Sequence, residues 1–267
     1  MQWSEAIKEH VETLKPIHIN TAVINRLMSL IDLTSLNETD TEESIALFLG
    51  KAINPFGHVA AVCVGPAFVR LAVAQYGNSP IQIGTVANFP EGAAALETVL
   101  IEIGRALQDG AQEVDVVFPY QRYLAGERQY AQTFVESCKA VCGNQVILKV
   151  ILETGALGDP AIIADASYDA IAAGADFIKT STGKISEGAT FTAAATILLV
   201  IKHVYNQFNR QVGFKVAGGI REVQQAAQYV ALAEQILGRD WVQPASFRIG
   251  SSKLVDELIR EGGALNE

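Results

Sequence analysis

The chain has 267 residues, of which 49% are hydrophobic and 18% are charged, so it can bury a large core as one α/β barrel or as two smaller domains. Its formal net charge of −9 argues against nucleic acid as a partner, because phosphate backbones are bound by clustered Lys and Arg. The first 20 residues alternate charged and apolar side chains and contain no apolar run typical of a signal peptide or a membrane span. We therefore expect a cytoplasmic chain with no membrane partner.

The cysteines and histidines indicate neither a disulfide framework nor a metal centre. An odd count of three cysteines in a chain of this size is typical of reduced thiols. The four histidines lie far apart in the sequence and show no HxH or HExxH spacing. We expect no metal and no cofactor.

Eight short apolar or β-branched runs alternate with stretches of helical periodicity, which is typical of βα units. The expected strands are residues 28–34, 59–65, 81–88, 113–119, 146–153, 175–181, 212–219 and 247–252. The helix candidates between them are residues 40–52, 92–110, 127–143, 159–173, 190–209, 221–237 and 252–261.

Eight such units in about 250 residues predict a single (β/α)8 TIM barrel. The expected organisation is a short helical N-terminal extension over residues 1–26, a barrel over 27–260 and a tail over 261–267. A doubly wound open sheet is the alternative, but no GxGxxG follows an early strand to favour it.

The barrel makes a testable demand on the charged residues, because alternate side chains of a strand point to the interior. In "EVDVVFP" the apolar residues Val114, Val116 and Phe118 form the outward set, so Asp115 points inward. The same parity turns four more charged side chains inward from four other runs, toward the catalytic mouth at the carboxyl ends of the strands. These are Asp32, Lys149, Lys179 and Lys215.

Two interpretations of these converging charges stay open. The lysines and aspartates could neutralise one another in a purely structural network. Burying several ionisable groups costs several kcal/mol each, however, so a converging set favours catalysis. A lysine with pKa near 10.4 is almost fully protonated at pH 7, whereas a neighbouring cation and desolvation can bring its pKa to roughly 7 to 8. Such an amine can form a Schiff base.

The loops after the last three strands predict a phosphate site. "STGK" (181–184), "AGGIR" (217–221) and "GSSK" (250–253) combine glycines, small hydroxyls and basic residues. Barrels commonly hold a phosphate at these loops with backbone N–H groups and a helix N-terminus. Glycine allows the backbone to approach the ligand closely.

Six segments together resemble the motifs of deoxyribose-phosphate aldolase, a class I aldolase family that forms a Schiff base. They are "LIDLTSLN", "EVDVVFPY", "LKVILETG", "AGADFIKTSTGK", "GFKVAGGIR" and "RIGSS", and the likeness runs from about residue 27 to 257. The resemblance implies reversible cleavage of 2-deoxy-D-ribose 5-phosphate, a small phosphorylated sugar, into D-glyceraldehyde 3-phosphate and acetaldehyde. It also implies a homodimer.

The resemblance implies roles for individual residues. Lys179 would be the Schiff-base nucleophile, Lys215 the neighbour that lowers its pKa and Asp115 the group that moves protons, with Lys149 a supporting charge. Asp32 and Lys184 would contact substrate hydroxyls or the acid/base network. The phosphate would be held by Gly183, Gly218, Gly219, Gly250 and Ser252.

One departure concerns proton transfer at the enamine carbon. Some bacterial relatives use a terminal tyrosine there, whereas this chain ends in "GGALNE" and its last tyrosine is Tyr229. Two other functions stay open, namely a Schiff-base aldolase for another phosphorylated sugar and a sugar-phosphate binding barrel without activity.

Overall fold

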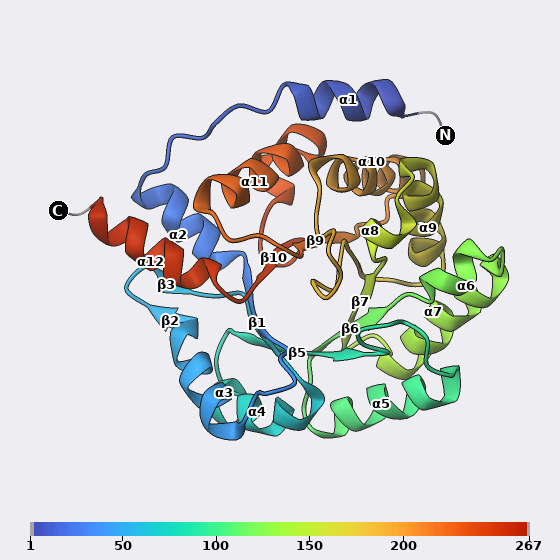
Figure 1. Ribbon diagram of the computed structural model, residues 1–267, viewed down its shortest axis with the longest axis horizontal. Helices are drawn as coiled ribbons and strands as arrows, with labels where there is room; N and C mark the ends of the chain where they lie inside the picture. Colours follow the sequence, from blue (N-terminus) through green and yellow to red (C-terminus); the bar gives the residue numbers. More distant parts are fainter. Residues whose placement is uncertain (1–2, 266–267) are drawn as a thin grey trace.

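Eight parallel strands close into a barrel in the computed structural model of the protein, which describes residues 3–265. The strand order around the barrel is β1-β10-β9-β8-β7-β6-β5-β4, so consecutive strands of the barrel are neighbours and the sheet has no open edge (Figure 1). The barrel strands are β1 (Ile31–Ser35), β4 (Ala61–Val64), β5 (Gln82–Ala87), β6 (Glu113–Val117), β7 (Ile147–Ile151), β8 (Phe177–Lys179), β9 (Gly213–Ala217) and β10 (Phe247–Ser251). The predicted TIM barrel is confirmed, and the open-sheet alternative is wrong.

Helices surround the barrel and cover its outer face (Figure 1). They are α3 (Glu42–Leu49), α4 (Val69–Tyr76), α5 (Leu96–Gln108), α6 (Tyr120–Leu124), α7 (Arg128–Cys142), α8 (Thr154–Leu157), α9 (Pro160–Ala172), α10 (Phe191–Phe208), α11 (Val223–Leu237) and α12 (Leu254–Ala264). Each of the seven predicted stretches contains helix. The predictions did not include α4, whose eight residues carry a mostly apolar sequence, or the short helices α6 and α8.

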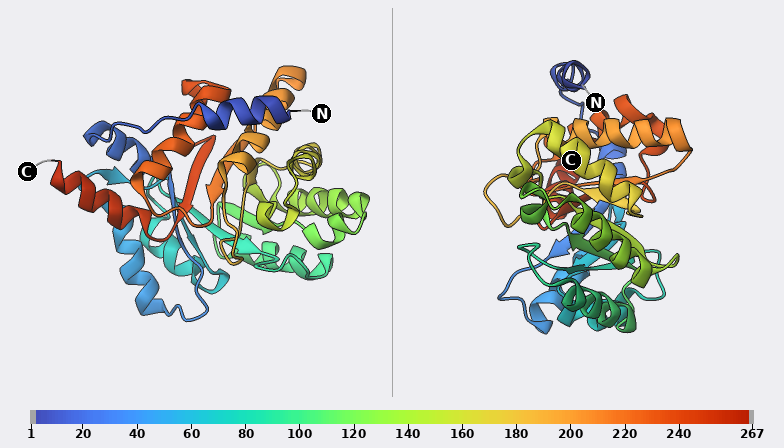
Figure 2. Two further views of the ribbon diagram at one scale, coloured as in Figure 1. Left: turned by 45° about the horizontal axis from the view of Figure 1, so that its top comes forward. Right: turned by 90° about the vertical axis from the view of Figure 1, so that its right-hand side faces the viewer.

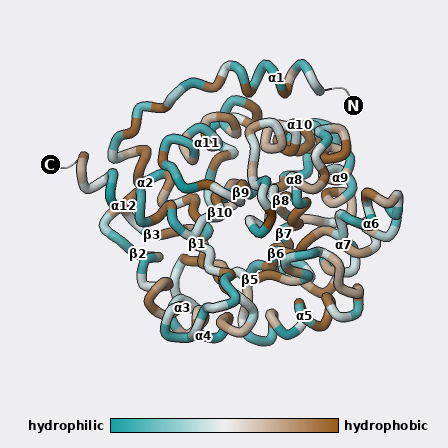
Figure 3. The backbone as a smooth tube through the Cα atoms, in the orientation of Figure 1, coloured by the Kyte–Doolittle hydropathy of each residue, from teal (hydrophilic) through white to brown (hydrophobic). Residues whose placement is uncertain are grey.

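Hydroxyl and carboxylate side chains fix several helix starts, as their positions before periodic stretches predict. The Thr190 side chain accepts a hydrogen bond from Ala193 N at the start of α10, and Asp159 accepts one from Ala161 N at the start of α9. Along α5 the buried residues Val99, Ile103 and Ala106 recur at helical spacing, which turns one face to the strands. The resulting alternation of hydropathy along this helix is visible in Figure 3.

Two helices precede the barrel. Helix α1 (Ser4–Glu12) lies outside the barrel against α10 and α11, and α2 (Thr21–Ser29) leads directly into β1 (Figures 1 and 2). The first residues of the expected strand 28–34 therefore finish a helix instead. Helix α12 continues to Ala264, into the stretch expected as a tail, and residues 1, 2, 266 and 267 of the expected terminal segments lie outside the described residues.

A short hairpin before β4 and a phenylalanine ring inside the barrel complete the fold. Strands β2 (Ile53–Asn54) and β3 (Gly57–His58) pair antiparallel before β4 and had no counterpart among the predicted elements. Inside the barrel, the Phe177 ring occupies the space next to Gly213, where an added Cβ would lie 2.4 Å from the ring. The barrel interior is thus a packed core, and the charged residues of the candidate active site lie above it.

Candidate active site

Seven charged side chains from six strands meet inside the barrel, and each residue is at most 3% exposed. Five of them are the residues whose parity on the strands predicted an inward direction, and the structure brings all five together. The register explains the contact, because Lys179 is the lateral partner of Lys215, and Asp115 is the partner of Lys149. The cluster comprises Asp32, Glu113, Asp115, Lys149, Lys179, Lys215 and Arg248.

Asp115 lies at the centre of the cluster and contacts three lysines. Its Oδ2 accepts hydrogen bonds from Lys179 Nζ at 2.8 Å and from Lys215 Nζ at 2.7 Å. Its Oδ1 accepts one from Lys149 Nζ at 3.1 Å. Because the Nζ atoms of Lys179 and Lys215 both contact Asp115 Oδ2, the distance between the two nitrogens is at most the sum of their distances to that oxygen. The two lysines therefore lie on the same side of the strands and close together.

The other members form a layer of ion pairs around this centre. Asp32 contacts Lys215 at 2.5 Å and Arg248 at 2.7 Å. Arg248 also reaches Glu113 at 2.8 Å, and Glu113 accepts a hydrogen bond from Lys149. Asp32 is fully buried among these cations, and its expected role toward substrate hydroxyls or the acid/base network stays a prediction. Among residues 3–265, Lys179 is the member of this cluster that lines the pocket described below.

The surroundings shift the pKa values of the two central lysines in opposite directions. Burial lowers the pKa of Lys179, and the nearby Lys215 lowers it further, against the attraction of Asp115. For Lys215 burial acts in the same direction, but Asp115 and Asp32 outweigh it and raise the pKa above its ordinary value. Lys215 has two carboxylate partners whereas Lys179 has one. Of the two lysines, Lys179 is therefore the one that loses its proton more readily.

The two aspartates of the cluster both have lowered pKa values. Burial alone would raise the pKa of Asp115, yet Lys149, Lys179 and Lys215 hold it well below the ordinary value. Burial likewise opposes ionisation of Asp32, but Lys215 and Arg248 lower its pKa. Within residues 3–265 no group of three or more His, Cys, Asp or Glu side chains is arranged to hold a metal ion.

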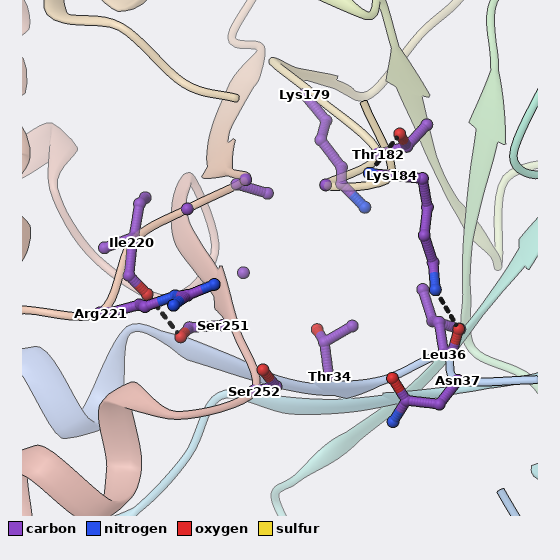
Figure 4. Close-up of a pocket in the computed structure, with 15 residues that line it drawn as sticks. Thr34, Leu36, Asn37, Lys179, Thr182, Lys184, Ile220, Arg221, Ser251 and Ser252 are labelled. Atoms are coloured by element: carbon purple, nitrogen blue, oxygen red, sulfur yellow. Dashed lines mark hydrogen bonds between the residues drawn. The ribbon is translucent and has the colours of Figure 1, made fainter. Parts of the chain in front are cut away.

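A pocket of about 180 Å³ opens above Lys179, at the carboxyl ends of β1, β8, β9 and β10. In Figure 4 the Lys179 side chain points into it from above, with Thr34 and Ser252 on the opposite side. The lining residues are Thr34, Leu36, Asn37, Lys179, Thr182, Gly183, Lys184, Ala217, Gly218, Gly219, Ile220, Arg221, Gly250, Ser251 and Ser252. The structure thus brings the five residues predicted to hold a phosphate, together with Lys184, to the same cavity as Lys179.

Glycines let the loops around this pocket approach one another. Gly183, Gly218 and Gly219 have φ values of 77°, 99° and 82°, which favour glycine. At Gly250 an added Cβ would lie 2.9 Å from Ala217 Cβ and 3.1 Å from Lys215 Cε. Gly250 therefore leaves the room in which the Lys215 side chain extends.

The start of α12 faces the same pocket. The Ser251 hydroxyl accepts from Leu254 N at 3.2 Å and donates to the Ile220 carbonyl at 2.8 Å, which ties the loop after β10 to the loop after β9 (Figure 4). A helix N-terminus attracts anions, and Lys184 and Arg221 add two cations to the rim. Lys184 Nζ donates to the Leu36 carbonyl at 2.7 Å, so it also bridges to the loop after β1.

A buried carboxylate supports the loop that carries Lys184. Glu153 follows β7 with a left-handed φ of 56°, and its carboxylate accepts hydrogen bonds from the backbone N and the hydroxyl of Thr182. The Thr182 oxygen in turn accepts from Lys184 N at 3.1 Å. Burial raises the pKa of Glu153 despite these hydrogen bonds.

Sequence reasoning assigned no role to Glu113, Glu153 or Arg248. A signal for Glu113 was present, because it lies two residues before Asp115 and shares its inward parity; Arg248 is likewise two residues from Gly250. The conformation of Glu153 left no signal in the sequence. Tyr229 lies in the core, where its hydroxyl donates to the Ala189 carbonyl at 3.0 Å, so it does not reach the pocket.

This geometry suits addition of an amine to the carbonyl group of an anionic ligand. The candidate nucleophile is buried and has a lowered pKa, a carboxylate lies within hydrogen-bond distance of it, and a loop cradle for an anion shares its cavity. A carbonyl carbon near Lys179 and an anionic group near α12 would belong to opposite ends of one small molecule.

Several solved structures are similar to this protein over most of its length. A protein from Toxoplasma gondii ME49 assigned as a deoxyribose-phosphate aldolase has a similar structure, with TM-score 0.83 and 26% identity over 92% of this chain and 96% of its own. A protein from Coccidioides immitis with the same assignment has TM-score 0.77 and 25% identity over 97% and 96% of the two chains. The deoxyribose phosphate aldolase from Aeropyrum pernix, described as tetrameric, shares the fold with TM-score 0.74 and 24% identity over 98% and 99%.

The sequence match is to the DeoC/LacD family of aldolases and covers residues 26–243, which include β1 to β9 and six of the seven charged residues of the cluster. On that match, the chain belongs to the DeoC/LacD aldolase family.

Proposed function

We propose that this aldolase reversibly cleaves 2-deoxy-D-ribose 5-phosphate into D-glyceraldehyde 3-phosphate and acetaldehyde through a Schiff base on Lys179. One observation carries the proposal. The Lys179 amine shares the Asp115 Oδ2 atom with Lys215 and faces the same cavity as the glycine loops of β9 and β10. These neighbours support a nucleophilic amine and a phosphate-binding site that act on the two ends of one small phosphorylated aldehyde.

In the cleavage direction, the neutral Lys179 amine attacks C1 of the open-chain sugar and forms a carbinolamine. A proton passed to the C1 oxygen lets water leave, and a protonated Schiff base remains. The C3 hydroxyl then loses its proton, the C2–C3 bond breaks, and its electrons enter the iminium to give an enamine. Glyceraldehyde 3-phosphate departs, C2 is protonated, and hydrolysis releases acetaldehyde. Asp115, at 2.8 Å from Lys179 Nζ, is the proposed group that accepts and returns protons, directly or through a water.

Lys215 and Lys149 support these steps through their contacts with Asp115. Lys215 stays protonated between Asp115 and Asp32, so it repels a proton from Lys179 and holds Asp115 in place. Lys149 binds the other oxygen of Asp115. Asp32 is proposed here to act through Lys215, as part of the acid/base network.

The substrate phosphate would lie against Gly183, Gly218, Gly219, Gly250 and Ser252, with the N-terminus of α12 behind it. Lys184 and Arg221 are the lysine and arginine that line this pocket besides the nucleophile, and they supply the local positive charge that an acidic protein needs for an anionic substrate. Thr182 is available for a substrate hydroxyl beside them.

Borohydride trapping tests the proposal. Incubation with acetaldehyde and borohydride should add a reduced two-carbon group to Lys179, detected by peptide mass spectrometry, and Lys179→Ala should abolish both adduct and turnover. Lys139→Ala is the matched control, since Lys139 pairs with Asp176 at 2.7 Å and is absent from the pocket lining within residues 3–265. An adduct elsewhere, or turnover by Lys179→Ala, would refute the assignment.

Cleavage rates of deoxyribose 5-phosphate, fructose 1,6-bisphosphate and a ketose phosphate would separate this activity from a Schiff-base aldolase for another sugar. Binding without turnover of any of them would identify a binding barrel instead. We further propose a homodimer that acts in the cytoplasm. Light scattering tests the assembly, with a tetramer, as described for the Aeropyrum pernix protein, as the contrary outcome. Within residues 3–265, no helix is both long enough and apolar enough to cross a membrane.

A further inference from the structure

The buried cluster balances its charge only if one of its cations is neutral. It contains four basic side chains, Lys149, Lys179, Lys215 and Arg248, and three carboxylates, Asp32, Glu113 and Asp115. An uncompensated buried charge is strongly unfavourable, because the interior solvates it poorly. Since the arginine is always protonated, the missing proton has to come from a lysine.

Contacts decide which lysine gives up its proton. Lys149 contacts Glu113, Asp115 and Asp32, and Lys215 contacts Asp115 and Asp32. Lys179 contacts Asp115 alone among the carboxylates of the cluster. The cation with the fewest anionic partners is thus the one that faces the pocket.

Arg248 and Glu113 contribute to this charge balance, but they lie away from the pocket and take no part in the steps proposed above. Arg248 is held by Glu113 at 2.8 Å, by Asp32 at 2.7 Å and by the Pro244 carbonyl, to which its Nε donates. Neither Arg248 nor Glu113 is among the residues that line the pocket within the described chain. Arg248 is the lateral partner of Lys215, which is the lateral partner of Lys179, so its backbone lies two strands from the nucleophile.

We propose that Glu113 and Arg248 are positioning residues that set the charge state of Lys179 through the total charge of the cluster. This inference rests on the proposed function, because it assumes that the neutral amine of Lys179 is the nucleophile. Removing the Arg248 charge leaves an excess of carboxylates, which a protonated Lys179 would neutralise. Removing the Glu113 charge leaves an excess of cations, which disfavours protonation of Lys179.

The other ionisable groups around Lys179 do not take over the effect of Glu113 and Arg248 on its protonation. Asp115 and Lys215 act on Lys179 directly, and both remain in place in variants of Glu113 or Arg248. Burial raises the pKa of the Cys63 thiol to about 11, so at neutral pH it adds no charge. Glu153 is a further carboxylate near Lys179, and its own hydrogen-bond partner is Thr182.

The experiment measures the midpoint pH of borohydride trapping of acetaldehyde at Lys179 in the whole protein. A unit charge about 10 Å away in a medium of effective dielectric about 20 shifts a pKa by about one unit. Arg248→Met should therefore raise the midpoint by about one unit, and Glu113→Gln should lower it by a similar amount. The double variant, which removes one charge of each sign, should return to within a few tenths of the wild-type midpoint.

Controls separate this role from a structural one. Arg210→Met removes an arginine that binds the Ile171 and Ala175 carbonyls and should leave the midpoint unchanged. Arg248→Lys retains the charge and should stay close to wild type. If Arg248→Met does not fold, the downward shift in Glu113→Gln decides alone, since the two side chains have the same shape. Unchanged midpoints, or shifts of equal sign in both single variants, would overturn the inference. Absence of a Lys179 adduct in the wild type would instead overturn the proposed function.

Discussion

Replacing Lys215 by methionine tests the electrostatic basis of the site. Lys179 and Lys215 lie 2.8 and 2.7 Å from the same oxygen of Asp115, and both are almost fully buried, so solvent screens them little. Two charges about 5 Å apart in a medium of effective dielectric about 20 repel by about 3 kcal/mol, or about 2 pKa units. Loss of the Lys215 charge should raise the pKa of Lys179 by about that amount.

The sign follows from the nucleophile being the neutral form. A higher pKa leaves about 100-fold less neutral amine at pH 7, so kcat/KM should fall by about that factor there. Activity should recover as the pH rises through the new pKa. The protein should still fold, because Asp32 retains Arg248 and Asp115 retains Lys149 and Lys179.

The assay is the rate of deoxyribose 5-phosphate cleavage between pH 6 and pH 10, with circular dichroism to check folding at each pH. Lys139→Met is the matched control, since it removes an ammonium paired with Asp176 outside the cluster and should leave the profile unchanged. A Lys215→Met profile with the wild-type midpoint would refute the electrostatic role. Loss of activity at every pH would show that Lys215 takes part in the chemistry itself.

Two further predictions concern packing and stability. Gly250→Ala places a methyl group 2.9 Å from Ala217 Cβ and 3.1 Å from Lys215 Cε, so kcat should fall and the free energy of unfolding should drop by about 1 to 3 kcal/mol. Gly104→Ala is the control, because an added Cβ there meets no atom within 4 Å, and it should leave kcat unchanged. Rate measurements and denaturation are made on both variants, and equal effects of Gly250→Ala and Gly104→Ala would contradict the steric argument. Asp115→Asn should lower the free energy of unfolding at pH 7 by about 3 to 5 kcal/mol, because it removes a buried carboxylate that three lysines contact and leaves an uncompensated buried positive charge. Folding lowers the pKa of Asp115, so its contribution to the free energy of unfolding is present above about pH 4 and is lost as the pH falls toward its pKa in the folded protein. The difference in free energy of unfolding between wild type and Asp115→Asn, measured by urea denaturation, should therefore narrow at low pH. A difference that does not narrow would contradict this reasoning.

The elements and the inward parity could be predicted because they depend on local patterns. Alternation of apolar and charged residues in "EVDVV" and "LKVI" is enough to turn Asp115 and Lys149 to one face of a strand. The hairpin at Ile53–His58 and helix α4 were missed, since the first has two-residue strands and the second has weak periodicity.

The heights of the charges along the barrel could not be predicted from parity. Lys179 is level with Lys215 and Arg248 in the register of the strands, whereas Asp32 is level with Gly250, two residues beyond Arg248. Depth depends on the stagger between strands, which closure of the barrel fixes. Parity alone therefore did not show that, among residues 3–265, Lys179 is the member of the cluster that lines the pocket.

By itself, the sequence determined an eight-stranded barrel with five inward charges and three glycine-containing loops after its last strands, because strand periodicity and glycine requirements act over a few residues. Tertiary structure alone decided that Asp115 lies between Lys179 and Lys215, that Arg248 and Glu113 complete the cluster, and that Glu153 adopts a left-handed conformation beneath Thr182. These contacts join residues up to 216 positions apart, as between Asp32 and Arg248, and only closure of the sheet brings them within reach of one another.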